Sequence, residues 1–135
     1  MTNDEKQLLI KDLCARLPYK LHCMVFKLNG DIKENDDILY GVMGDNVVTL
    51  KSDNDECLMY YQIKLYLRPI SSMTKEEQKE FVEFHCVNLC RIIMDEKLTL
   101  KDETKMFDWL NAHHFDYRGL IAKGLALEAP EEMYK

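Results

Sequence analysis

The sequence predicts one α+β domain: an N-terminal helix, a small antiparallel β-meander and two to three C-terminal helices. Apolar residues recur at helical spacing near the N-terminus, short β-type runs between turn residues fill the middle, and helical spacing returns after Pro69. A length of 135 residues with 47% hydrophobic and 31% charged residues is ordinary for one compact domain, and the chain has no repeat or long linker. We therefore expect residues 1–135 to form a single domain.

The first predicted element is an amphipathic helix over residues 4–16. Asn3 or Asp4 can serve as its N-cap, and Pro18 ends it because a proline disfavours helical geometry in the residue before it. The apolar positions at helical spacing are Leu8, Leu9, Ile10, Leu13 and Leu17. This stripe predicts that the helix packs against the rest of the domain.

Residues 19–67 read as an antiparallel meander. The β-type runs cover residues 21–28, 38–43, 47–51 and 57–65. Gly44-Asp45-Asn46 indicates a tight hairpin, since glycine and asparagine tolerate the positive φ that such turns require. The acidic stretches 31–37 and 52–56 are expected to be loop tips.

Residues 74–128 form the predicted helical region. Thr74-Lys75-Glu76-Glu77 is a capping box that begins a helix reaching to about residue 95. Its core-facing stripe is expected to contain Val82, Cys86, Leu89 and Ile93. A weaker cap at Thr99 begins a helix with Met106, Trp109, Leu110 and His113 on one side. A short apolar segment over 116–127 then packs against the body.

Charge, apolar runs and cysteine content argue against a nucleic-acid-binding protein, a membrane-spanning protein and a disulfide-bonded protein. The net charge is −6, and 24 acidic residues outnumber 18 scattered basic ones, which disfavours direct binding of nucleic acid. No apolar run approaches the roughly 20 residues of a membrane span. Five cysteines without close pairs and a polar start predict a cytoplasmic protein in a reducing compartment, without disulfides.

Two segments carry a resemblance to a known group of proteins. The junction over 64–77, which contains Tyr66-Leu67-Arg68-Pro69-Ile70-Ser71-Ser72-Met73-Thr74, and the closing segment 115–126, with Asp116-Tyr117-Arg118-Gly119-Leu120-Ile121, resemble small uncharacterised proteins of gut-bacterial phages and prophages. The resemblance implies a mobile-element origin and a β portion similar to SH3-like or Sm-like folds. It implies no activity and transfers no functional residue.

A metal centre is one alternative. His85, Cys86 and Cys90 on one predicted helix, with His113 and His114 on the next, are residue types that zinc accepts. The competing interpretation is that Cys86 packs as a small hydrophobe in its helix stripe. One of the two neighbouring histidines would then cap a helix C-terminus.

Catalytic templates are missing from the sequence. It has no glycine-rich phosphate loop, no GxSxG elbow and no HExxH motif, so we assign no catalytic residue and no cofactor, and we expect a protein that is not an enzyme. The candidate contacts for a ligand or partner are Tyr61, Arg68, Trp109 and Arg118. Arg118 lies in a cramped turn, where a structural salt bridge is the competing role.

Three functional hypotheses follow. The leading one is a non-catalytic module that binds a host or phage protein through its sheet edge or acidic face. The second is a small-ligand protein that sequesters a nucleotide signal in phage–host conflict, at a homo-oligomer interface lined by Tyr61, Arg68 or Arg118. The third is a zinc protein or hydrolase built on the histidine and cysteine cluster.

Overall fold

The computed structural model describes residues 1–52, 58–83 and 100–134. The first element, α1 (Asn3–Arg16), agrees with the predicted helix. Its N-cap is Thr2, not Asn3 or Asp4: the Thr2 hydroxyl accepts from the Glu5 amide at 3.1 Å, and the Glu5 carboxylate accepts from the Thr2 amide at 2.8 Å. Thr-x-x-Glu is a capping box, and it determines where the helix begins.

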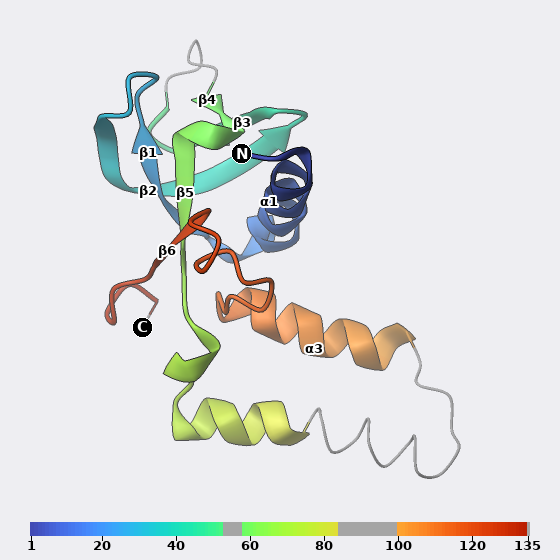
Figure 1. The fold of residues 1–135 in the computed structure, drawn as a ribbon. Coiled ribbons are helices and arrows are strands. Elements are labelled where there is room, and N and C mark those ends of the chain that lie inside the picture. The colour runs from blue at the N-terminus through green and yellow to red at the C-terminus, as the bar shows by residue number, and fades with distance from the viewer. Residues whose placement is uncertain (53–57, 84–99, 135) are drawn as a thin grey trace.

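A six-stranded sheet has the order β4-β3-β2-β1-β5-β6. Its strands are β1 (His22–Phe26), β2 (Ile32–Met43), β3 (Asn46–Thr49), β4 (Leu58–Met59), β5 (Ile63–Leu67) and β6 (Ala126–Glu128). All neighbouring strands are antiparallel except β5 and β6, which are parallel. The fold is therefore α+β with a mostly antiparallel sheet, as the sequence predicted, and α1 lies beside that sheet (Figure 1).

The meander differs from the prediction in two places. Residues 32–37 belong to β2 and are not a loop, since the first part of this long, bent strand pairs with β1 and the later part with β3. Acidic residues are tolerated there because the side chains of residues 32–36 are at least partly exposed. The predicted strand over 57–65 is interrupted by a 3₁₀ turn, Tyr60–Gln62.

The predicted hairpin is confirmed. Met43 pairs with Asn46 across a turn formed by Gly44 and Asp45, and Gly44 has a φ of 60°. A residue with a side chain is strained at this φ, which explains the glycine. The acidic stretch over 52–56 lies almost entirely outside the described residues.

The junction after β5 leads into helices. A 3₁₀ turn (Ile70–Ser72) follows Pro69, and residues 75–83 are helical with the predicted capping box of Thr74 and Glu77 in place. Val82 is 54% exposed, so its expected core position is wrong. Phe81 packs inward in its place, with its ring 5.9 Å from that of Trp109 in α3 (Leu100–Ala112). Cys86, Leu89 and Ile93 lie outside the described residues.

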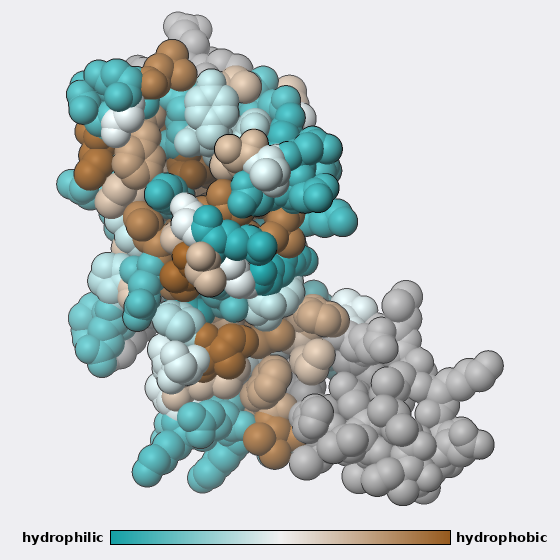
Figure 2. All heavy atoms as spheres, in the orientation of Figure 1, coloured by the Kyte–Doolittle hydropathy of each residue, from teal (hydrophilic) through white to brown (hydrophobic). Residues whose placement is uncertain are grey.

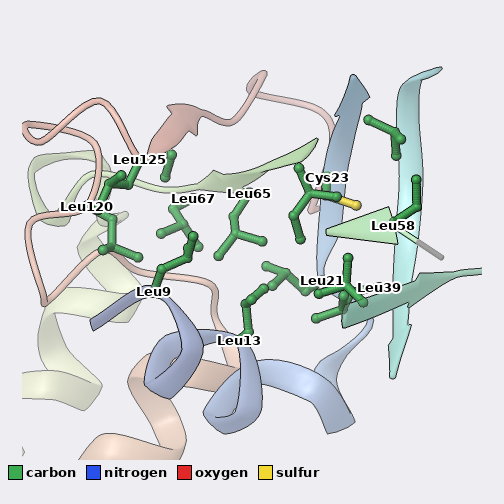
Figure 3. Packing of buried hydrophobic residues seen from close by; sticks show 14 residues of the cluster. Leu9, Leu13, Leu21, Cys23, Leu39, Leu58, Leu65, Leu67, Leu120 and Leu125 are labelled. Atoms are coloured by element: carbon green, nitrogen blue, oxygen red, sulfur yellow. The ribbon is translucent and has the colours of Figure 1, made fainter. Parts of the chain in front are cut away.

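The core lies between α1 and the sheet (Figure 3). Leu9 and Leu13 of α1 meet Leu65 and Leu67 of β5, and Leu120 and Leu125 close the cluster from the C-terminal segment. No helix within the described residues combines the length and apolar character that a membrane span needs.

Replacing Ile63 with valine tests this packing. Ile63 is 2% exposed in β5, so the lost methylene should lower the free energy of unfolding by about 1 kcal/mol. Ile32→Val in β2, at 51% exposure, is the matched control and should have little effect. Urea unfolding of both variants measures the difference, and equal losses would contradict the assigned core.

Candidate binding groove

A groove of about 670 Å³ lies where three distant parts of the chain meet. The residues that line it are Arg68, Pro69, Ser72, Thr74, Glu77, His113, Glu128, Ala129, Pro130, Glu131 and Tyr134. They come from the junction after β5, the end of α3, and the end of β6 with the tail that follows it. Figure 2 shows hydrophilic surface over this tail and over the helical segment that begins at residue 75.

Backbone pairing holds the junction against the end of α3. The Arg68 amide donates to the His114 carbonyl and the Asp116 amide donates to the Arg68 carbonyl, both at 2.8 Å. This bridge pairs Arg68 with Phe115. Pro69, which is extended, has no amide proton to donate to a neighbouring strand, so Arg68, a lining residue of the groove, lies where the pairing ends.

The guanidinium of Arg68 is bound on two sides. Its Nη1 and Nη2 donate to the two carboxylate oxygens of Glu77 at 2.8 and 2.7 Å. The guanidinium carbon lies 4.3 Å from the centre of the Phe115 ring. The hydrogen bonds from Arg68 hold the pKa of Glu77 at about 2, so the pair is ionised and its charges cancel.

His113 has a defined tautomer in this site. Its Nδ1 lies 2.8 Å from the Trp109 carbonyl oxygen. Because a carbonyl only accepts, the neutral ring carries its proton on Nδ1 and presents Nε2 as an acceptor. The ring also stacks on Trp109 with centroids 4.2 Å apart.

Trp109 packs against His113 without lining the groove itself. Its Nε1 donates to the Glu80 carboxylate at 2.8 Å, and its ring stacks on Phe115 with centroids 5.7 Å apart. These contacts tie α3 to the helical segment at 75–83 and fix the position of His113.

Tyr134, which lines the groove, holds the tail against the sheet. Its hydroxyl donates to the Tyr66 carbonyl at 2.7 Å and accepts from the His22 amide at 3.0 Å, so it bridges β5 and β1 beyond their last paired residues. The His114 ring stacks on Tyr134 at 3.7 Å between centroids. Burial, reinforced by nearby cationic groups, lowers the pKa of His114 to about 4.

Tyr134→Phe should lower the free energy of unfolding by about 1–3 kcal/mol. The change removes one hydroxyl and leaves the His22 amide and the Tyr66 carbonyl without their partner. Tyr40→Phe, at 69% exposure, is the control and should be nearly neutral. Thermal and urea unfolding measure both, and a neutral Tyr134→Phe would mean that the hydroxyl bridge does not fasten the tail.

The other predicted contacts lie away from the groove lining. Tyr61 is 51% exposed in the turn before β5, at the opposite end of that strand from Arg68. Arg118 has its Nη1 3.6 Å from an Asp12 carboxylate oxygen and its guanidinium 4.9 Å from the centre of the Tyr117 ring. Of the four predicted contacts, Arg68 lines the groove, Trp109 supports it, and Tyr61 and Arg118 belong elsewhere.

Of the five residues in the metal hypothesis, three lie outside the described part of the chain and two lie within it. His85, Cys86 and Cys90 lie outside the described residues. His113 lines the groove, while His114 is not among the lining residues and stacks on the Tyr134 ring. Within residues 1–52, 58–83 and 100–134, no group of three or more histidine, cysteine or acidic side chains is placed to hold a metal ion.

Sequence reasoning missed several residues of this region. Glu77 was predicted only as a helix cap, although the same carboxylate binds Arg68. Glu128, at the end of β6, and Tyr134, in the tail after it, fall in a stretch that carries no recognisable motif. Asp12 and Arg16, four apart inside the first helix, could have been noticed as an ion pair at helical spacing.

Comparisons with protein-family models, with curated proteins and with solved structures found no match.

Proposed function

We propose that this chain is a non-catalytic protein-interaction module of phage or prophage origin, which binds a host or phage protein in the cytoplasm through the groove at Arg68. The observation that carries the proposal is the bidentate ion pair between Arg68 and Glu77. The guanidinium of Arg68 is therefore already paired within the protein. A partner would contact the polar and apolar side chains of the remaining lining residues.

The charge of the groove weighs against the nucleotide alternative. A phosphate would have to displace Glu77 from a bidentate, partly buried pair before it could bind Arg68. Arg118, the other cation considered for that role, is directed to the buried carboxylate of Asp12. A protein partner requires neither pair to break.

We also propose that the β portion belongs to the SH3-like or Sm-like class and that two to three helices complete the chain. The order β4-β3-β2-β1-β5, the bend in β2 and the 3₁₀ turn between β4 and β5 support a small, partly closed meander. Such folds carry many unrelated functions, so the proposed function rests on the groove.

Site-specific photocrosslinking in the cells that naturally make the protein tests the proposal. A benzophenone amino acid replaces Ser72 in the groove lining, and in a matched variant it replaces the exposed Lys79 of the helical segment 75–83, which is not a lining residue. We expect a discrete protein adduct from position 72 that position 79 does not give. An absence of adducts, or the same adducts from both positions, would contradict partner binding in the groove.

A further inference from the structure

The side-chain donors of the groove are largely used within the protein. Four lining residues donate to neighbours: a guanidinium to a carboxylate, and a hydroxyl, an imidazole and a phenol to backbone carbonyls. These residues are Arg68, Ser72, His113 and Tyr134. A ligand that needs donors from the protein therefore finds few in this groove.

Acceptors, by contrast, are present on three of the lining residues. Ser72 Oγ donates its proton to the Pro69 carbonyl at 2.7 Å and keeps its lone pairs for a ligand. His113 presents Nε2, because Nδ1 holds the proton. Glu128, exposed at the end of β6, adds a carboxylate.

The lining is also negatively charged. It contains the carboxylates of Glu77, Glu128 and Glu131 and the single guanidinium of Arg68. Because Glu77 and Arg68 neutralise each other, the charge that a ligand meets at the end of β6 is the exposed carboxylate of Glu128. The net charge of the whole chain, −6, has the same sign.

We infer that the groove binds a lysine- or arginine-bearing segment of the partner protein. This inference deepens the proposed function and rests on it. Ammonium and guanidinium groups are cations that donate hydrogen bonds and accept none, so they match a lining that offers acceptors and negative charge. Pro69, Ala129 and Pro130 supply apolar surface for the aliphatic stem of such a side chain.

Binding of a fluorescein-labelled hexa-arginine peptide tests the chemistry directly. Its affinity for the full chain is measured by fluorescence anisotropy at low salt, beside a hexa-citrulline peptide of the same shape without charge. Amide chemical-shift mapping locates the peptide. We expect the arginine peptide to bind, with shifts at residues 68–77 and 128–134, and the citrulline peptide to bind at least about tenfold more weakly.

Charge reversal of Glu128 separates the groove from general attraction to an acidic protein. Glu128→Lys should weaken peptide binding by about tenfold or more, because it places a like charge beside the ligand. Glu83→Lys changes the net charge equally at an exposed position outside the groove, and its affinity should stay within about twofold of the wild type. Equal effects of both variants would overturn the inference.

Combining the peptide and crosslinking results separates this inference from the proposed function. Crosslinking at position 72 is repeated in the Glu128→Lys background, where the adduct should be lost. If the adduct persists there and the arginine peptide does not bind, the partner hypothesis holds and the inference is wrong. If the peptide binds in the groove but position 72 captures no protein in cells, the groove chemistry holds and the proposed function is wrong.

Discussion

Replacing Arg16 with methionine is expected to lower the free energy of unfolding by about 3–5 kcal/mol. Arg16 is fully buried, and its Nε donates to Asp12 at 2.8 Å while its Nη2 donates to the Phe115 carbonyl at 2.5 Å. Methionine fills similar volume but donates nothing. Within the described residues, the substitution therefore leaves the buried carboxylate with Arg118, at 3.6 Å, as its remaining counter-ion.

The environment of Asp12 makes this loss larger than that of a surface ion pair. Burial raises the pKa of Asp12 above its usual value although Arg16 and Arg118 oppose the shift, so the carboxylate depends on its partners to stay ionised. Without Arg16, the folded protein must either keep a poorly paired charge in the core or bind a proton. Both outcomes destabilise the folded state.

Two further variants make the Arg16 experiment decisive. Lys11→Met, at an exposed position of the same helix, should change stability by less than about 0.5 kcal/mol. The double variant Asp12→Leu with Arg16→Met should be more stable than Arg16→Met alone, because it removes both charges together. Urea unfolding measures all three. A loss below about 1 kcal/mol for Arg16→Met would show that the pair does not support the packing of α1 against residues 115–118.

Acidification from pH 6.5 to pH 4 is expected to destabilise the folded protein through His114, by a contribution on the order of 3 kcal/mol. The cause is burial of the ring against Tyr134, followed by the positive charges of Arg16, His22, Arg68 and His113. These lower the pKa of His114 from 6.5 to about 4 in the folded state. Between these values the unfolded chain binds a proton at His114 and the folded chain does not, so stability falls as the pH falls.

His114→Asn isolates that contribution. The residue has a φ of 62°, which asparagine tolerates better than most residues, and asparagine does not titrate. The variant loses the stacking on Tyr134, so it should be less stable at pH 8, but its stability should fall less between pH 6.5 and 4. Parallel profiles for the two proteins across that range would exclude His114 as the cause.

Below pH 4.5 both proteins should lose stability together. Glu77 has a folded-state pKa of about 2, lowered from 4.5 by the hydrogen bonds from Arg68. Its contribution is present above pH 4.5 and disappears as the pH falls toward 2. Chemical denaturation at each pH, compared between wild type and His114→Asn, separates the two titrations.

The sequence alone determined those features that depend on neighbouring residues. The first helix follows from apolar positions three and four apart, the hairpin from Gly44 and Asp45, and the later helix start from Thr74 and Glu77. Each of these is stabilised by contacts that span only a few residues. A local pattern therefore predicts them, and the α+β class follows from their order.

Only the tertiary structure decided which residues meet around the groove. The acidic residues of β2 form a strand because β1 offers them a pairing partner, which no local pattern reveals. Arg16 binds the Phe115 carbonyl across 99 positions of sequence, and Tyr134 reaches the His22 amide across 112. The same kind of contact brings residues 68–77, 113 and 128–134 together around the groove. Side chains so far apart become neighbours only when the sheet order and the packing of α1 are set, because those long-range contacts, and not the intervening sequence, hold them in place.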